Sequence, residues 1–261
     1  ISDGSAALTG LLLALNLPAT LPLWKAAVGC IFAIAVVKQL FGGLGCNFAN
    51  PAITGRVFLL LSFAGDMTTW VKPFYYHGLS IGNQLSSSAG SLDLDAVTSA
   101  TPLVTGTESL SNLFLGNVGG CIGETSALAL LLGGLFLIFT RVISPSTPIA
   151  YLGSLGILTF FHALATGGSL TEVPYALLSG GVMIGAFFMA TDYVTTPITT
   201  KGKWIFGIGC GILTFVIREF ASMPEGCSFS ILLMNLLTPY IDKFTMTKPL
   251  GAKPIKQKEE A

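Results

Sequence analysis

Residues 95–102 read DAVTSATP, which places one carboxylate and three hydroxyl groups directly before a proline. Thr101 precedes Pro102, so its backbone favours an extended conformation that presents the hydroxyl outward. The small side chains of Ser99 and Ala100 would let the active site of another protein close on the chain. The stretch therefore suits a modification of Thr101, and an ordinary Ser/Thr-rich turn is the alternative.

The composition around this stretch is that of a membrane protein. Of the 261 residues, 52% are hydrophobic and 10% are charged, and the mean hydropathy is +0.75. A typical soluble domain carries about 25% charged residues. Because the net charge is zero, nothing indicates a nucleic-acid partner. We expect an all-α integral membrane protein that has the lipid bilayer as its surroundings.

Eight apolar segments approach the length that spans a bilayer. The first segment is short and ends at Pro18, so it could be a half-helix that does not cross the whole membrane. Because the chain opens at Ile1 without a methionine, we expect it to be part of a longer protein. The segments cover residues 6–18, 24–42, 51–65, 125–142, 148–165, 174–190, 203–220 and 228–241.

Basic residues predict how these segments are oriented. Five lysines follow the last segment, which places the C-terminus in the cytoplasm by the positive-inside rule. Counting back over five crossings puts the long loop 66–124 outside. Arg141 and the pair Lys201 and Lys203 then fall inside, in agreement with the same rule.

Two parts of the chain resemble each other. Trp24 corresponds to Trp204, Lys38 to Arg218, and a Gly-Cys pair follows each tryptophan at the same distance. The two parts begin on opposite sides of the membrane, so they form inverted repeats, which commonly hold a substrate or cofactor between them. Duplication kept only for packing is the alternative. The predicted units are 1–65 (first repeat), 66–124 (external loop), 125–166 (connecting helices), 174–241 (second repeat) and 242–261 (basic tail).

The cysteines and histidines predict no metal site. The five cysteines are far apart and include no C-x-x-C pair, so we expect buried thiols rather than an iron–sulfur cluster. His77 and His162 are also far apart, and His162 lies in an apolar segment as a core residue would. We therefore expect no metal bound by this chain alone.

Residues 95–101 match a specific pattern, D-x-x-[ST]-x-A-T, with Asp95, Thr98, Ala100 and Thr101 at its fixed positions. With this motif the chain resembles the RnfD/NqrB family, in which the final threonine carries FMN through a phosphoester bond. The similarity extends along nearly the whole chain, through KQLFGGLG, GRVFLLLSF, MTTW, GGCIGETS and FFMATDYVTTP. The family often has glycine where Ala96 and Ser99 stand.

The resemblance implies a function. It implies a subunit of an Rnf-type ferredoxin:NAD oxidoreductase in the bacterial cytoplasmic membrane that couples electron transfer to Na⁺ or H⁺ translocation. It also implies covalent FMN on Thr101, a second non-covalent flavin, which could be riboflavin, and a flavin transferase that attaches the FMN. The implied partners are the other membrane and peripheral subunits, including a second flavin-carrying subunit and iron–sulfur subunits. An NqrB-like subunit of a Na⁺-translocating NADH:quinone oxidoreductase and a non-redox transporter or channel are the alternatives.

Several residues could surround the flavin. Gly119 and Gly120 run into a predicted helix that Thr125 or Ser126 would cap, and free N–H groups there could receive a phosphate unless Glu124 faces the same oxygens. A Gly-rich turn that merely enters the segment is the alternative. Two bases near the loop could also approach the flavin, namely Lys72 and Arg56.

Arg56 lies within an apolar segment, where an ionisable side chain indicates a functional site. It could instead pair with Asp66 or bind carbonyl groups. Asp192, in FMATDYVTTP, is a further candidate, for ion coupling or for the inner electron-exit site, with Lys201 or Lys203 as its partner. A turn in which the carboxylate binds its own backbone is the alternative for Asp192.

Overall fold

The computed structural model describes residues 4–70, 108–221 and 225–246, and these residues are helical, without a strand. This confirms the all-α prediction, and each of the eight predicted segments overlaps a helix. The helices of the first part are α1 (Ser5–Leu15), α2 (Leu23–Ile31), which continues into the π-helix η1 (Phe32–Gln39), α3 (Pro51–Ser62), α4 (Ala64–Met67) and α8 (Leu110–Leu115). Those of the second part are α9 (Ala127–Phe139), α10 (Ser146–Thr166), α11 (Glu172–Leu178), α12 (Val182–Ile184), which continues into the π-helix η4 (Gly185–Met189), α13 (Thr200–Phe220) and α14 (Gly226–Thr245).

Helix lengths bear on how many of these elements cross a bilayer. In the described residues, α10 and α13 have 21 residues each and are apolar enough to span by length and composition. The pair formed by α11 and α12–η4 could be a third span, bent by 64° at its break. Helices α1, α3 and α9 are apolar but shorter. The eight predicted crossings therefore stay a prediction.

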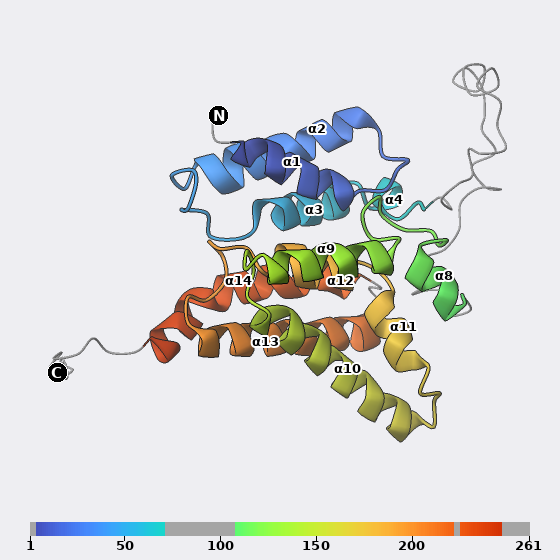
Figure 1. Ribbon diagram of the computed structural model, residues 1–261. Helices are drawn as coiled ribbons and strands as arrows, with labels where there is room; N and C mark the ends of the chain where they lie inside the picture. The colour runs from blue at the N-terminus through green and yellow to red at the C-terminus, as the bar shows by residue number, and fades with distance from the viewer. Residues whose placement is uncertain (1–3, 71–107, 222–224, 247–261) are drawn as a thin grey trace, which may run out of the picture.

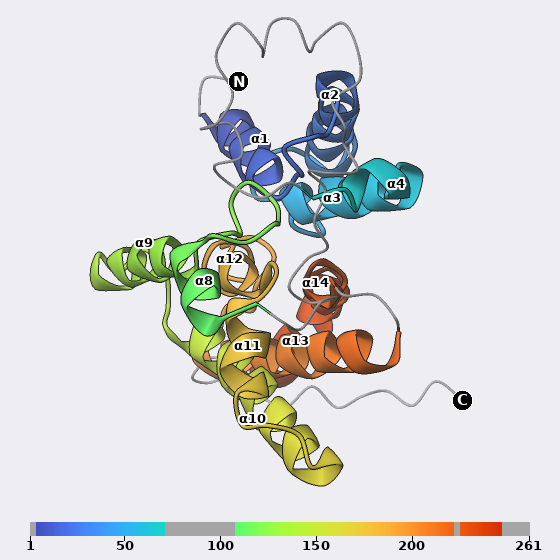
Figure 2. The same cartoon turned by 90° about the vertical axis from the view of Figure 1, so that its right-hand side faces the viewer.

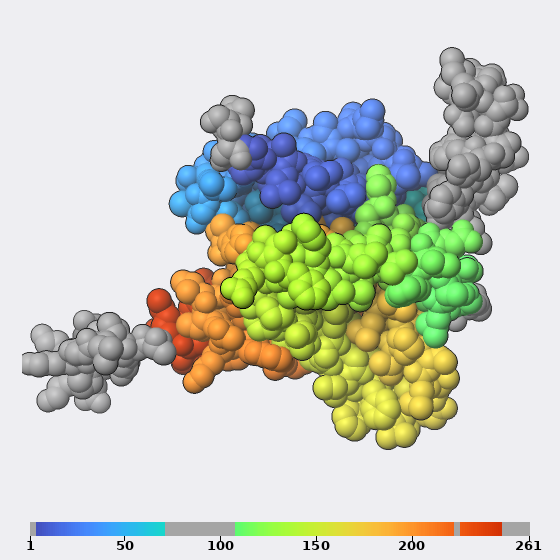
Figure 3. Space-filling view, viewed as in Figure 1, coloured from blue at the N-terminus to red at the C-terminus, as the bar shows by residue number. Residues whose placement is uncertain are grey.

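The helices form two groups with a third layer between them. Helices α1, α2 and α3 lie together, α10 and α13 lie on the opposite side, and α9, α12 and α14 lie between (Figures 1 and 2). In the space-filling view, α9 spreads over the face between the two groups (Figure 3). One continuous core joins the groups, and it includes Leu13 and Ile53 from the first group, Tyr151 and Phe206 from the second, and Ile231 of α14 from the layer between them.

Glycines set the distance between α10 and α13. A Cβ on Gly207 would lie 2.8 Å from the carbonyl oxygen of Thr147, and a Cβ on Gly211 would lie 2.8 Å from that of Tyr151. Small residues four positions apart let two helix backbones approach closely, as they do in membrane proteins. The backbone contact therefore depends on the absence of these two side chains.

The predicted segment 174–190 is broken in the middle. Helix α11 ends at Leu178, Gly180 has φ 65°, and α12 begins at Val182. A positive φ is accessible to glycine without strain, so Gly180 permits the sharp change of direction. The break leaves the backbone of residues 179–181 open to side chains from other helices.

Helix α3 begins with strong local signals. The Asn50 side chain accepts hydrogen bonds from the backbone N–H groups of Ala52 (3.0 Å) and Ile53 (3.3 Å), and Pro51 occupies the first helical position. Both features are typical of helix N-termini. They fix the register that directs Arg56, one turn later, into the interior between the two groups.

Candidate functional site

The predicted flavin-attachment residues lie outside the described residues. These are Asp95, Thr98, Ser99, Ala100 and Thr101, together with the base Lys72. The remaining candidates belong to two places that the structure does describe. One is a buried polar cluster around Arg56, and the other is a cavity lined by Asp192.

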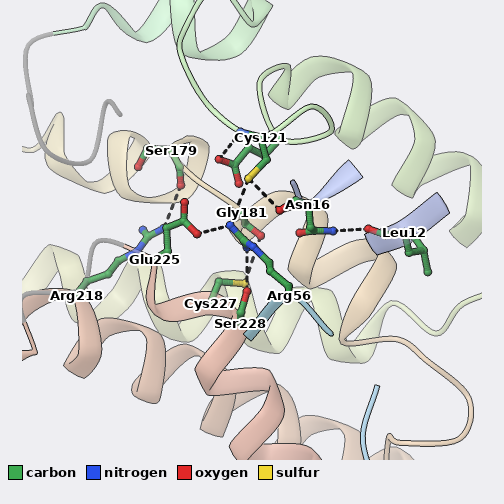
Figure 4. Close-up of polar contacts among 11 residues, drawn as sticks. Leu12, Asn16, Arg56, Cys121, Ser179, Gly181, Arg218, Glu225, Cys227 and Ser228 are labelled. Atoms are coloured by element: carbon green, nitrogen blue, oxygen red, sulfur yellow. Dashed lines mark hydrogen bonds and ion pairs between the residues drawn. The ribbon is translucent and has the colours of Figure 1, made fainter. Parts of the chain in front are cut away.

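Arg56 is only 2% exposed and connects three separate parts of the chain (Figure 4). Its Nη1 donates to the Ser228 hydroxyl at 2.9 Å, and its Nη2 donates to the Cys121 sulfur at 3.3 Å and to the Glu225 carboxylate. Ser228 belongs to α14, Glu225 immediately precedes it, and Cys121 lies in the turn before α9. A buried arginine thus joins α3 of the first group to both other parts.

Asp66, the alternative partner proposed for Arg56, is engaged elsewhere. It forms an ion pair with Lys25 at the start of α2. The Lys25 ammonium also lies 5.3 Å from the ring centroid of Trp24 and 5.0 Å from that of Phe63. The pairing of Arg56 with Asp66 is therefore wrong.

The turn before α9 is attached to the end of α1. The Gly123 N–H donates to the Leu15 carbonyl at 2.7 Å, and the Cys121 thiol donates to the Asn16 carbonyl at 3.2 Å. Within the turn, Glu124 Oε1 accepts from the Cys121 N–H at 2.9 Å. This contact brings the Glu124 carboxylate into the cluster around Arg56.

Helix α9 itself is capped by Ser126, whose hydroxyl accepts from the Ala129 N–H at 3.3 Å. Gly120 lies against the Glu124 carboxylate, because a Cβ on Gly120 would be 3.0 Å from Oε1. A carboxylate of the chain thus accepts one of the N–H groups of this turn. The predicted role of Gly119, Gly120 and Thr125 near a flavin phosphate stays a prediction.

Arg218 approaches the cluster from α13 and binds the broken helix. Its Nη1 donates to the Ala176 carbonyl at 2.7 Å, and its Nη2 donates to the Ser179 carbonyl at 3.0 Å. From α14, the Cys227 thiol donates to the Gly181 carbonyl at 3.3 Å. Polar side chains therefore satisfy carbonyl groups that the break between α11 and α12 would otherwise leave unpaired.

Burial dominates the electrostatics of this cluster. It raises the pKa of Glu225 to about 7, although the charge of Arg56 acts in the opposite direction. Burial also raises the pKa of the Cys121 thiol well above its ordinary range, and the nearby Glu124 carboxylate adds to this effect. The thiol is therefore neutral at physiological pH.

A cavity of about 340 Å³ lies where η1 ends, α3 begins and η4 ends. Polar groups on its lining come from Lys38, Asn47, Asn50, Thr191 and Asp192. Lys38 is only 4% exposed, and no other basic residue among the described ones lines this cavity. The apolar part of the lining includes Leu8, Leu12, Leu137, Phe187 and Phe188.

Asp192 forms the local turn that the sequence allowed, and it also lines the cavity. Its carboxylate accepts hydrogen bonds from the Val194 N–H at 3.5 Å and from the Thr195 hydroxyl at 3.1 Å. The basic group whose charge acts on it is Lys38, and it forms no ion pair with Lys201 or Lys203. Burial raises the pKa of Asp192 above its ordinary value, against the hydrogen bond from Thr195.

Sequence reasoning missed Lys38, Asn47 and Asn50 at the cavity, and Cys121, Glu225 and Arg218 in the cluster. Lys38 offered a signal, since it is an ionisable residue at the end of an apolar segment. Cys121 offered none, because a buried thiol that packs as an apolar group has the same sequence context.

Known proteins resemble this chain over its whole length. The model of the NQR2, RnfD, RnfE family matches residues 1–251. The D component of the Na(+)-translocating ferredoxin:NAD(+) oxidoreductase complex of Acetobacterium woodii is 47% identical, over 100% of this chain and 77% of the relative. The D component of the proton-translocating ferredoxin:NAD(+) oxidoreductase complex of Clostridium ljungdahlii is 44% identical, over 97% of this chain and 76% of the relative. The D component of the ion-translocating oxidoreductase complex of Stutzerimonas stutzeri is 42% identical, over 95% of this chain and 76% of the relative.

Proposed function

The chain belongs to the NQR2, RnfD, RnfE family, and from this we propose that it is the RnfD-type membrane component of a complex that transfers electrons between ferredoxin and NAD and translocates Na⁺ or H⁺. The similarity to the D components of such complexes carries this proposal. One relative is named for sodium and another for protons, so the proposal includes both ions. The partners are the other membrane and peripheral subunits of the complex, including iron–sulfur subunits and a second flavin-carrying subunit.

Within this complex, the chain carries FMN on Thr101. The motif formed by Asp95, Thr98, Ala100 and Thr101, with the small Ser99 within it, supports the attachment by a flavin transferase. When bound, a flavin accepts and donates electrons, and the protein sets its position and its access to water. Arg56 and Lys72, named as possible flavin surroundings, keep that role only as a proposal.

The cavity at Asp192 fits the second, non-covalent flavin. Its apolar wall suits the flat ring system of a flavin, and its polar groups suit the ring edge that carries nitrogen and oxygen atoms. Lys38 would hold that edge, since Asn50 is already engaged as the cap of α3 and donates to the Met189 carbonyl at 3.3 Å, and Asn47 donates to the Ala49 carbonyl at 3.2 Å. Asp192, beside Lys38, would adjust the charge around the ring.

We extend the proposal to the membrane arrangement. Two inverted repeats, residues 1–65 and 174–241, cross the bacterial cytoplasmic membrane with the connecting helices 125–166, in eight segments. The loop 66–124 lies outside, and the tail 242–261 lies in the cytoplasm. The lysines of the tail, together with Arg141, Lys201 and Lys203, support this orientation by the positive-inside rule.

The attachment is tested with the variant Thr101→Ala in the assembled complex. A phosphoester requires the hydroxyl, so this change is expected to abolish the flavin fluorescence of the chain on a denaturing gel and to reduce its intact mass by the mass of the attached group. Thr101→Ser is expected to retain part of the fluorescence. Thr105→Ala, in the same segment, is the matched control and keeps the full signal. Unchanged fluorescence in Thr101→Ala would contradict the assignment.

The NqrB-like alternative is favoured by one observation, namely that the matching family includes NQR2 proteins. It differs from the main proposal in the electron acceptor. Quinone reduction by the purified complex with NADH, without ferredoxin-dependent reduction of NAD, would select this alternative.

A further inference from the structure

The buried side-chain atoms without a hydrogen-bond partner, among the residues that the structure describes, all lie in one place. Such atoms are rare in native proteins, and each needs an explanation, such as an ordered water, an ion or a proton. They gather around Arg56, in the cluster that Figure 4 draws. The five atoms are Arg56 Nε, Glu124 Oε2, Ser179 Oγ, Arg218 Nε and Glu225 Oε1.

Two of these atoms are carboxylate oxygens of neighbouring glutamates. The Cys121 sulfur and one carboxylate oxygen from each of Glu124 and Glu225 all lie within 4.8 Å of one another. Glu124 is 6% exposed and the Glu225 side chain 12% exposed, so water screens their repulsion poorly. Gly181 leaves room beside them, because a Cβ there would be 3.2 Å from Glu124 Oε2.

Among the described residues, Glu225 accepts a hydrogen bond from a guanidinium group of the cluster, and Glu124 does not. Arg56 donates to Glu225, to the Cys121 sulfur and to Ser228, and it makes no hydrogen bond to Glu124. Arg218 directs its two terminal nitrogens to backbone carbonyls of the broken helix. Two close carboxylates thus have one hydrogen-bonding guanidinium between them, an arrangement that favours a proton on one carboxyl group.

A metal ion would suit this cluster poorly. Hard cations prefer six or more oxygen ligands, and the cluster offers two carboxylates and a thiol. The thiol is neutral, and two guanidinium groups would repel an added cation. A proton, by contrast, needs only one carboxylate oxygen.

We propose that Glu225 binds one exchangeable proton beside the Glu124 carboxylate, so that this cluster is a buried proton-binding site between the two helix groups. The charged and titratable groups that face the pair are Arg56 from α3, Arg218 from α13, Cys121 from the turn before α9 and Cys227 from α14. Burial raises the pKa of Glu225 to about 7, so the proton is released to water as the pH rises through neutrality and is taken up again as it falls. The site does not depend on where the flavins bind.

The test is infrared difference spectroscopy of the purified complex during a pH titration. A protonated carboxyl group has its own C=O band, and the parent complex is expected to lose one such band as the pH rises through neutrality. Glu124→Gln retains an oxygen that accepts from the Cys121 N–H but removes one carboxyl group of the pair. In this variant Glu225 loses the repulsion of Glu124 and keeps the favourable charges of Arg56 and Arg218, so its titration is expected to move down by about one pH unit or more.

Two further variants complete the test. Glu225→Gln is expected to remove the neutral-pH band, and Glu219→Gln, an exposed residue of α13, is the matched control that leaves it unchanged. A titration that is unchanged in Glu124→Gln, with normal elution in size-exclusion chromatography, would overturn the proposal. So would a band that moves with the Na⁺ concentration at fixed pH, because a cation would then occupy the site.

Discussion

At the cavity, a single carboxylate stabilises its own turn and faces the space where a ligand would bind. Asp192 accepts hydrogen bonds from Val194 and Thr195, which hold the carboxylate in place, and it lies within reach of the charge of Lys38. The hydrogen bonds of a turn thus keep an ionisable group positioned at the cavity wall. The hydrogen bonds of the side chain and the effect of its charge on the cavity can therefore be tested separately.

The variant Asp192→Asn tests the role of the charge. The amide oxygen can still accept one of the two turn hydrogen bonds, so the fold is expected to persist, while the positive charge of Lys38 is no longer opposed. We expect ferredoxin-dependent NAD reduction and ion uptake into vesicles to fall several-fold. Asp66→Asn removes a carboxylate that does not line the cavity and is the matched control. If both rates and their ratio equal those of the parent while flavin content is unchanged, Asp192 serves only its turn.

At the scale of elements, the contact between α10 and α13 is sensitive to a single added methyl group. Gly207→Ala would place a methyl group 2.6 Å from the Ala150 Cβ and 2.8 Å from a backbone carbonyl. Overpacking of this kind costs about 1–3 kcal/mol, so we expect the thermal midpoint of the purified protein in detergent to fall. Gly153→Ala, on α10, meets no atom within 4 Å and gains up to about 1 kcal/mol of helix propensity. Equal midpoints for the two variants would contradict this packing.

The helices were predictable from the sequence, because long apolar runs bounded by Pro, Gly and charged residues leave few alternatives. The break at Ser179, Gly180 and Gly181 was not predicted, since a Gly-Gly pair within an apolar run is also tolerated in an unbroken helix. The π-helical stretches η1 and η4 were missed as well, because they depend on packing rather than on a local residue pattern.

The candidate sites were predictable only in part. Arg56 and Asp192 could be selected because ionisable residues in or beside apolar segments are costly. Glu225, the partner of Arg56, could not, because it is 169 positions away and the sequence alone does not show which helices pack together. The attachment motif at Thr101 lies outside the described residues and stays a prediction.

At the scale of the whole molecule, the orientation in the membrane can be tested with a native cysteine. Cys46 is exposed and lies between η1 and α3, at an end that the charge rule places inside, whereas Cys121, Cys210 and Cys227 are buried. We expect an impermeant maleimide to label Cys46 in cells only after lysis. On a Cys46→Ser background, Ser88→Cys is expected to react from outside without lysis. The background without an introduced cysteine is the control, and the reverse labelling pattern would invert the proposed topology.

The ion pair between Arg56 and Glu225 also limits how the two groups of helices can move. Alternating-access carriers open to each side of the membrane by rocking one bundle against the other. Here such rocking would pull α3 away from the start of α14 and separate a buried arginine from its carboxylate. Separating a buried pair costs about 3–5 kcal/mol, because each charge is left without compensation. The ion pair therefore holds α3 against the start of α14 and opposes a rocking motion that would separate them.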